Sequence, residues 1–396
     1  QTLALDDGPV QLTLESVAVT RGARALASFS VLEVEASDGR GANLTRLAAI
    51  IEATGYVVPE PRSKEEIARH HVARAAEDPS RRLPRVPTSP GIGADDTLGE
   101  AGRKVLRLHL ARMLHFEAGT RSGEDIEDLH RMRVSTRRMR AAWRVLDGSN
   151  RPKAQRRYVR ELRGIARALG RVRAVDVLLE NPDVYLENLP APGREAMGPL
   201  RAAWRRRRET ERRRLIARLD SRQYREFVDD YLDFTRSPRA ADALLPLGRP
   251  SLVKHTAGSL ILAAYERVRA YETFITWTDA SALHALRIEG KRLRYTMEDF
   301  AEVLPDTAGT LITQVKEMQD HLGLMNDADV AAIATRGWLG LNAPTLSAGS
   351  RDAVSRYLDA REAEAEQLRR SFGPLWRRIT GRTFRRALGA AITHIE

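Results

Sequence analysis

Residues 129–140 read LHRMRVSTRRMR, and residues 283–294 read LHALRIEGKRLR, so one basic pattern occurs twice in the chain. A second match follows in each copy, where Leu-Gly precedes Asp-Val at 169–177 and again at 322–330. Matches that recur at a fixed separation, here roughly 150 residues, are the mark of a duplicated structural unit. The repeat therefore predicts two copies of one helical unit, related by a pseudo-two-fold axis.

The basic residues of each copy fall on one face of a predicted helix. At about 100° per residue, the histidine and the cations of the first copy lie within an arc of about 80°, beside an arc of apolar residues. The second copy repeats this pattern, although Glu298 replaces its last cation. One further pair occupies equivalent positions later in each copy. The candidate binding residues are His130, Arg133, Arg137, Arg140, Arg144 and Arg163, and His284, Arg287, Lys291, Arg294 and Lys316.

Such a face of stacked like charges has no folding rationale of its own. Like charges three or four residues apart destabilise a helix by about a few tenths of a kcal/mol per pair. A bound anion would neutralise them, and because the basic arc adjoins the apolar arc we expect it beside a groove at the edge of the core. Two alternatives stay open. Single arginines can be solvated and paired with glutamates, and either histidine can bond a backbone carbonyl instead of an anion.

The composition also favours a polyanionic partner. The chain of 396 residues carries a formal net charge of +12. Arginine supplies most of the positive charge, and its planar fork suits phosphate oxygens. The absence of cysteine excludes disulfides and thiolate chemistry. No apolar run reaches the roughly 18 residues of a membrane span, so we expect a cytoplasmic protein with no membrane partner.

The chain changes character near residue 65. Alternating runs at 11–19 and 29–35 predict strands, residues 43–54 predict a helix, and almost everything after residue 100 has helical period. Expected helix breaks include Gly170 and Gly323, which would place Asp176 and Asp329 in the first turn of the next helix. We expect a mainly structural role for these two acids, with pairing to the basic face as the alternative. The predicted domains are 1–66 (β-rich), 67–98 (a helix and Pro/Gly-rich linker) and 99–396 (helical, with repeats at about 99–240 and 250–396).

The duplicated helix resembles the signature of the CHAD domain, the conserved histidine α-helical domain. The signature is His-x-x-Arg-x-x-x-(Arg/Lys)-Arg-x-Arg, and the resemblance covers about residues 95–396. It implies a mainly α fold with two pseudo-symmetric four-helix bundles around a basic pore that binds inorganic polyphosphate, without a cofactor, often with targeting to polyphosphate granules. One departure is Ala174, where the family often has Asp; Asn326-Asp327 keeps that acid in the second copy.

Residues 1–65 resemble the C-terminal part of a CYTH, or triphosphate tunnel, domain. The resemblance rests on Asp6-Asp7-Gly8, the alternating Glu33 and Glu35, the helix at 43–54 and Ser63-Lys64. The first-strand Glu-x-Glu-x-Lys motif of that family is absent. Glu33 and Glu35 would be the remaining candidates for a metal site, and Mg²⁺ is expected only if this part is active. A solvated strand face is the alternative for this pair.

Three functions follow as hypotheses. The first is a non-catalytic polyphosphate-binding module. The second is a helical protein that binds nucleic acid, which the shortage of aromatic residues on the basic faces disfavours. The third is a triphosphatase or polyphosphatase of the CYTH type, with the helical domain as its substrate-binding module. A further basic run at 201–218 wraps around its helix, so it is either solvated or lines the same cavity.

Overall fold

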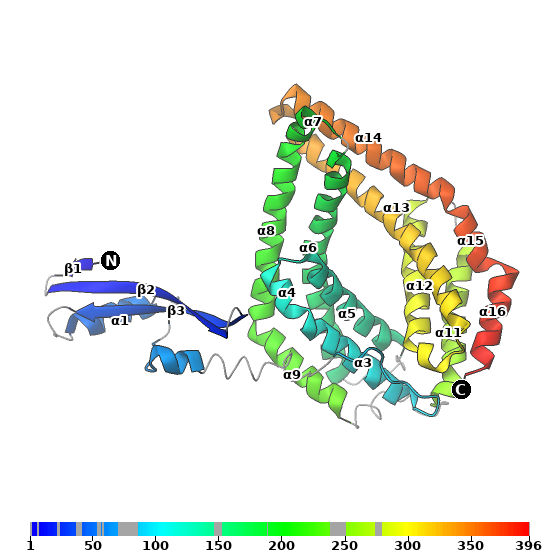
Figure 1. Ribbon diagram of the computed structural model, residues 1–396, viewed down its shortest axis with the longest axis horizontal. Helices are drawn as coiled ribbons and strands as arrows, with labels where there is room; N and C mark the ends of the chain where they lie inside the picture. Colours follow the sequence, from blue (N-terminus) through cyan, green and yellow to red (C-terminus); the bar gives the residue numbers. More distant parts are fainter. Residues whose placement is uncertain are drawn as a thin grey trace. The chain divides into compact units, whose positions relative to one another are not determined.

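The computed structural model describes residues 2–5, 8–21, 24–36, 42–53, 57, 59–69, 86–145, 153–187, 189–237, 251–273 and 279–395. The chain divides into two units, Gln1–Pro84 and Arg85–Glu396 (Figure 1). The second unit thus begins ahead of residue 99, the predicted start of the helical domain, and it includes the last part of the predicted linker.

The first unit contains a small antiparallel sheet. Strands β1 (Thr2–Leu5), β2 (Gly8–Arg21) and β3 (Arg24–Ala36) pair in the order β1-β2-β3, and helix α1 (Ala42–Ala53) follows. The predicted strands lie within β2 and β3, and the predicted helix coincides with α1 to within one residue. The β-rich character predicted for this segment is therefore confirmed.

Most of the described part of the second unit is helical, so the mainly α fold is confirmed. Helices from the first repeat are followed by helices in a similar order from the second. The first group is α3 (Leu98–His115), α4 (Glu117–Ser122), α5 (Ile126–Val145), α6 (Lys153–Glu187), α7 (Ala191–Ala196), α8 (Gly198–Asp220) and α9 (Arg222–Arg236). The second group is α11 (Val253–Arg269), η2 (Ala270–Thr273), α12 (Ala280–Asp299), η3 (Ala301–Val303), α13 (Ala308–Asn342), η4 (Ala343–Thr345), α14 (Ala348–Ser371), α15 (Gly373–Thr380) and α16 (Arg382–Thr393).

The expected helix breaks at Gly170 and Gly323 do not occur. Both glycines lie inside helices of 35 residues, α6 and α13. A glycine costs about 1 kcal/mol relative to alanine within a helix, which is small beside the burial of its apolar neighbours, such as the fully buried Leu169 and Leu322. Asp176 and Asp329 consequently lie in the middle of helices and not in a first turn, which corrects the prediction.

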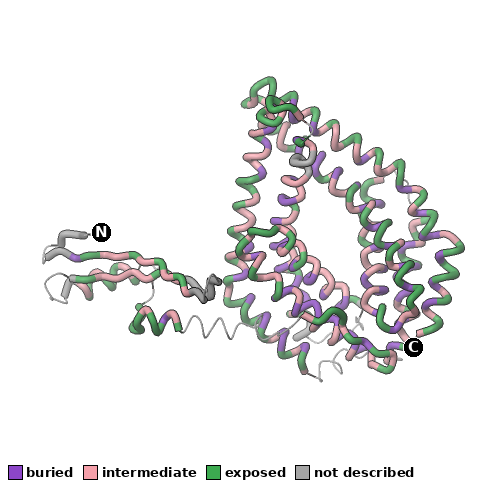
Figure 2. The backbone as a smooth tube through the Cα atoms, in the orientation of Figure 1, coloured by how far each residue is buried: buried purple, intermediate pink, exposed green. Residues whose placement is uncertain are grey.

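The helices of the second unit pack as neighbours in the order of the chain. α5 contacts α3 and α6, and α6 contacts α8, while α12 contacts α11 and α13, and α13 contacts α14. α5 and α12 each have 20 residues, and α6 and α13 each have 35. In Figure 1 these helix pairs follow one another around a closed ring. Figure 2 shows that buried positions recur along the helices where they pack on their neighbours.

Within the described residues, helices of the two halves of this unit pack together in two regions. At one of them, a buried apolar cluster joins α6, α7 and α8 to α13 and α14, with Trp204 and Tyr357 in edge contact at 6.5 Å between ring centroids. At the other, α5 contacts α12 and α3 contacts α11. The basic motifs of the two repeats lie on α5 and α12, so the second junction brings them together.

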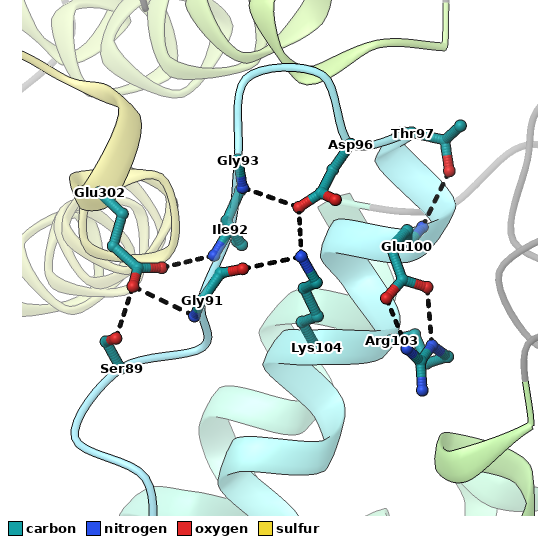
Figure 3. Close-up of polar contacts among 10 residues, drawn as sticks. All are labelled: Ser89, Gly91, Ile92, Gly93, Asp96, Thr97, Glu100, Arg103, Lys104 and Glu302. Carbon is teal, nitrogen blue, oxygen red and sulfur yellow. Dashed lines mark hydrogen bonds and ion pairs between the residues drawn. The ribbon is translucent and has the colours of Figure 1, made fainter.

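A strap at 86–97, which precedes α3, crosses from one half to the other (Figure 3). The carboxylate of Glu302 in η3 accepts hydrogen bonds from the backbone N–H groups of Gly91, at 3.1 Å, and Ile92, at 2.7 Å. Lys104 of α3 donates to the Gly91 carbonyl at 2.7 Å and pairs with Asp96 at 2.6 Å. These contacts fix the strap on both halves.

Backbone hydrogen bonds complete this connection. Val253 N–H donates to the Asp96 carbonyl at 2.9 Å, and Leu98 N–H donates to the Ser251 carbonyl. The start of α3 is thereby attached to the start of α11. No helix in the described part of the chain combines the length and the apolar character needed to cross a bilayer.

Candidate functional site

Four cations from the two repeats lie close together where α5 and α12 meet. They are Arg133 and Arg137 of α5 and Arg287 and Lys291 of α12, and we call them the basic cluster. Burial, followed by the positive charges of Arg137, Arg287 and Arg133, lowers the pKa of Lys291 to about 7. Burial, followed chiefly by neighbouring arginines that include Arg287, lowers the pKa of Arg133 to about 10. The predicted convergence of the two basic faces is therefore visible in the electrostatics of α5 and α12.

The positive charge of the basic cluster is poorly compensated. Within the described residues, none of its four side chains forms an ion pair, and the buried Nε atoms of Arg137 and Arg287 have no hydrogen-bond partner. The carboxylate of Asp327 raises the pKa values of Arg287 and Lys291, but for both groups burial is the larger effect and acts in the opposite direction. Half-buried cations without partners are costly unless an anion binds them.

The aromatic ring of Tyr295 on α12 contacts arginines at one side of this cluster. The guanidinium carbons of Arg137, Arg138 and Arg294 lie 5.5, 4.5 and 5.2 Å from the centroid of its ring. Because a tyrosine face attracts cations, the ring holds arginines of both repeats. Arg294, a predicted site residue, also lies 3.5 Å from Glu298, and its side chain is only 11% exposed. It lies in the junction and not among the unpaired cations.

The two motif histidines have different surroundings. Burial, then the charge of Arg173, lowers the pKa of the half-buried His130, whose Nδ1 has no partner. His284 is exposed, and its Nδ1 lies 3.0 Å from Oδ1 of Asn326 on α13. A side-chain amide therefore holds His284, in place of the backbone carbonyl considered as the alternative.

A second basic patch adjoins the basic cluster on α5. Burial, then the charges of Arg144, Arg163 and Arg167, lowers the pKa of Arg140. The predicted site residues Arg140 and Arg144 of α5 thus lie near Arg163 of α6. Lys316, predicted as the equivalent of Arg163, is exposed on α13 and has no described contact with either group.

Several residues near the cluster were not predicted as site residues. Arg173 and Asn326 stand beside the two histidines, Asp327 stands beside Arg287 and Lys291, and Tyr295 lies under the arginines. The Leu-Gly…Asp-Val match places Arg173 and Asn326 at equivalent positions. A residue-by-residue comparison of the two copies over this match could have identified Arg173 and Asn326 from the sequence.

Asp176 and Asp329 form ion pairs that hold helices together. Asp176 accepts from Arg208 of α8 at 2.6 Å, and Asp329 accepts from Arg369 of α14. Neither acid forms a described ion pair with the basic faces of α5 or α12. These contacts fit the predicted structural role of the two acids and not the alternative of pairing with the basic face.

The basic run on α8 is divided between two roles. Arg208 and Arg218 form ion pairs with Asp176 and Glu161 at 2.6 Å. Arg212 donates to backbone carbonyls of α4, including that of Thr120 at 3.1 Å. The remaining arginines include Arg205, Arg206, Arg207 and Arg213, which are exposed to solvent.

In the first unit, Glu33 is paired with a lysine. Lys64 Nζ lies 2.8 Å from Glu33 and 2.6 Å from Glu15, across β2 and β3. The two predicted metal-site candidates Glu33 and Glu35 belong to no group of three His, Cys, Asp or Glu suited to a metal ion, and the described residues contain no such group. Glu33 and Lys64 line a cavity of about 520 Å³ beside α1.

The helix order and the duplicated basic helix define a class of repeat-built helical domain. The family model described as the CHAD domain matches residues 104–336, more than half of the chain. The chain belongs to the CHAD domain family, and this part of the predicted resemblance is confirmed. The family model does not extend to the first unit, whose likeness to a CYTH domain stays a prediction.

Solved structures support the same fold. The crystal structure of the CHAD domain from the plant Ricinus communis is 23% identical, with a TM-score of 0.60, over 77% of this chain and 96% of that one. PptA from Streptomyces chartreusis is 17% identical, with a TM-score of 0.57, over 71% of this chain and 100% of that one. No curated protein matches the chain. At these identities the likeness extends to the fold alone.

Proposed function

We propose that the helical unit binds inorganic polyphosphate, with the basic cluster as its principal contact. The observation that carries this proposal is that Arg133, Arg137, Arg287 and Lys291 crowd together from two repeats without ion pairs in the described chain. Arginine forks match phosphate oxygens, and several forks in one place match a ligand with many of them.

The extent of the basic surface favours a chain over a single phosphate. On α5 the cations continue from Arg133 to Arg144, a rise of about 16 Å along the helix axis. Arg163 and Arg167 of α6 stand beside the far part of this stretch. A ligand with a regular series of negative charges would contact both the basic cluster and the second patch.

The proposal includes two four-helix bundles related by a pseudo-two-fold axis. Equal lengths of α5 and α12, and of α6 and α13, support this arrangement. The ion pairs Asp176–Arg208 and Asp329–Arg369 also join corresponding helices in the two halves. Two basic helices in such an arrangement present their faces to one shared ligand.

Nucleic acid is the weaker candidate partner. Proteins that bind single strands stack the bases on exposed aromatic side chains. Tyr295, the aromatic residue beside the basic cluster, is only 2% exposed and already carries arginines on its ring. A ligand made of phosphate alone needs no such platform.

Catalysis by the helical unit is not part of the proposal. Phosphoryl transfer ordinarily uses divalent metal held by carboxylates, and cations dominate this site. Triphosphatase activity is assigned to the first unit only if the protein hydrolyses tripolyphosphate in the presence of Mg²⁺. We also propose a cytoplasmic location on polyphosphate granules, since a binding module without its own chemistry fits a targeting role.

Salt-dependent competition tests the proposal. Four neutralised phosphates predict that log Kd for polyphosphate changes with log salt by a slope of about 3 in magnitude. Polyphosphate should also displace a bound single-stranded oligonucleotide at equal phosphate concentration. Failure to displace it would favour nucleic acid, and turnover of tripolyphosphate with Mg²⁺ would refute a purely binding function.

A further inference from the structure

The two repeats differ in charge at one point beside the basic cluster. The first has Arg173-Ala174, and the equivalent residues of the second are Asn326-Asp327. His130 therefore stands next to a cation, whereas its counterpart His284 is bonded to the amide of Asn326, which in turn is bonded to the carboxylate of Asp327. In the first repeat Arg173 is paired with the carboxylate of Glu180 at 2.7 Å, whereas in the second repeat the carboxylate of Asp327 forms no ion pair in the described chain.

A chain of hydrogen bonds fixes these acceptors in place. Asn326 Nδ2 donates to Asp327 Oδ1 at 3.1 Å, so Asn326 Oδ1 is the atom that faces His284 Nδ1 at 3.0 Å. His284 Nδ1 must then carry the proton that it donates. The second carboxylate oxygen of Asp327 has no partner in the described chain.

Asp327 lies on α13 and is bonded to Asn326, whose amide reaches His284 of the basic helix α12. Its charge raises the pKa values of both Arg287 and Lys291, yet it forms an ion pair with neither of them in the described structure. A carboxylate beside a phosphate site would repel most phosphates. It therefore has a binding role only toward a phosphate group that can donate a hydrogen bond.

The phosphates of a polyphosphate chain differ in this respect. Interior phosphates are fully ionised and offer only acceptor oxygens. A terminal phosphate has a second ionisation near pH 6, by analogy with phosphate monoesters, so it carries a hydroxyl for part of the time at neutral pH. That hydroxyl can donate to a carboxylate while the other oxygens accept from cations.

We infer that the second repeat recognises the end of a phosphate chain, with Asp327 accepting from the hydroxyl of the terminal phosphate. Arg287 and Lys291 bind the remaining oxygens of that group. Arg133 and Arg137 of the first repeat suit interior phosphates, which need donors alone. This inference rests on the proposed function, from which it takes the class of ligand.

Two small probes separate recognition of chain ends from general attraction. Linear tripolyphosphate and cyclic trimetaphosphate both contain three phosphorus atoms, but the ring has no terminal phosphate. Their dissociation constants are measured by calorimetry at about pH 6.5, at fixed salt and with a chelator that excludes metal bridges. The proteins are the wild type, Asp327→Asn, and Asp320→Asn, which removes the same charge at an exposed position of α13.

We expect Asp327→Asn to lower the preference for the linear over the cyclic probe on the order of tenfold, as for the loss of a hydrogen bond to a charged group. Asp320→Asn should leave that preference unchanged. Removing a negative charge alone would favour the more highly charged linear probe, so simple electrostatics predicts the opposite direction. Asparagine retains the size of the side chain and an oxygen for Asn326, so the fold should be kept, as circular dichroism will show.

An unchanged or increased preference in Asp327→Asn would overturn end recognition and leave Asp327 with the role of positioning His284 through Asn326. Polyphosphate binding itself would stand in that case. If the wild type binds neither probe nor long-chain polyphosphate at low salt, the proposed function fails, and end recognition fails with it.

Discussion

Glu298, in the last turn of α12, forms an ion pair with Arg138 of α5, 160 residues away in the sequence. Glu298 occupies the position in the second repeat that Arg144 occupies in the first, and it also pairs with Arg294 on its own helix at 3.5 Å. One substitution between the copies thus provides the acid that joins them. The junction beneath the basic cluster depends on this asymmetry.

Removing the acid should weaken the junction. In Glu298→Gln, Arg138 loses its partner while only 17% exposed, and we expect the free energy of unfolding to fall by about 1–3 kcal/mol. Urea denaturation followed by circular dichroism measures this change. Asp352→Asn is the matched control, because its pair with Arg356 is more than half exposed on both sides; it should change stability by about 0.5 kcal/mol or less. Equal effects of the two variants would contradict a special role for Glu298.

Tyr295 should act on binding through its ring. Tyr295→Leu removes the face under Arg137 and Arg138 and should weaken polyphosphate binding about two- to thirtyfold, given about 0.5–2 kcal/mol for such contacts. Tyr295→Phe keeps the face and should bind like the wild type. If both variants bind alike, the ring does not position the arginines.

Binding should depend on pH through Lys291. Its pKa of about 7 in the free protein rises when a polyanion binds, since the charged form is then favoured. Affinity is therefore full below about pH 7 and falls as the pH rises from about 7 toward the higher pKa of the complex. Lys291→Arg keeps its charge throughout this range, and its affinity should be flat between about pH 7 and 9. An identical pH profile for both proteins would contradict the assignment.

Stability should depend on pH through Asp299. Burial beside Leu98, Ala101 and Phe300 raises its pKa to about 7, so the folded state holds this proton more tightly than the unfolded state. The free energy of unfolding should fall as the pH rises from about 4 to about 7. Asp299→Asn should remove that slope and stabilise the protein at about pH 8. Asp306→Asn, at an exposed position, is the control that should leave the slope unchanged.

The repeat carried most of the structural information in the sequence. It predicted two sets of helices and the faces of α5 and α12 that meet, because a face of cations beside an apolar arc leaves few ways to pack. The strands β2 and β3 could also be predicted, from the alternation of apolar and polar residues along them. Gly170 and Gly323 misled the prediction, because glycine weakens a helix locally while burial along 35 residues decides whether the helix continues.

The site was less predictable in its details. Arg294 occupies the same position in its repeat as Arg140, but its side chain contacts Glu298 and the ring of Tyr295 in the junction between α5 and α12. Such a difference depends on contacts between α5 and α12 that no periodicity within one helix reveals. The position of Asp327 beside Arg287 likewise becomes visible only when α13 is placed beside α12.

The central claim is that cations of both repeats form one polyphosphate site. The most direct measurement is calorimetric titration of long-chain polyphosphate into the double variant Arg133→Glu/Arg287→Glu, compared with the wild type at the same salt. Arg382→Glu/Arg386→Glu on α16 makes the same change of charge at exposed positions and serves as the control. We predict no detectable binding to the double variant, unchanged helicity, and binding by the control within a fewfold of the wild type. Wild-type affinity in a folded double variant would contradict the claim.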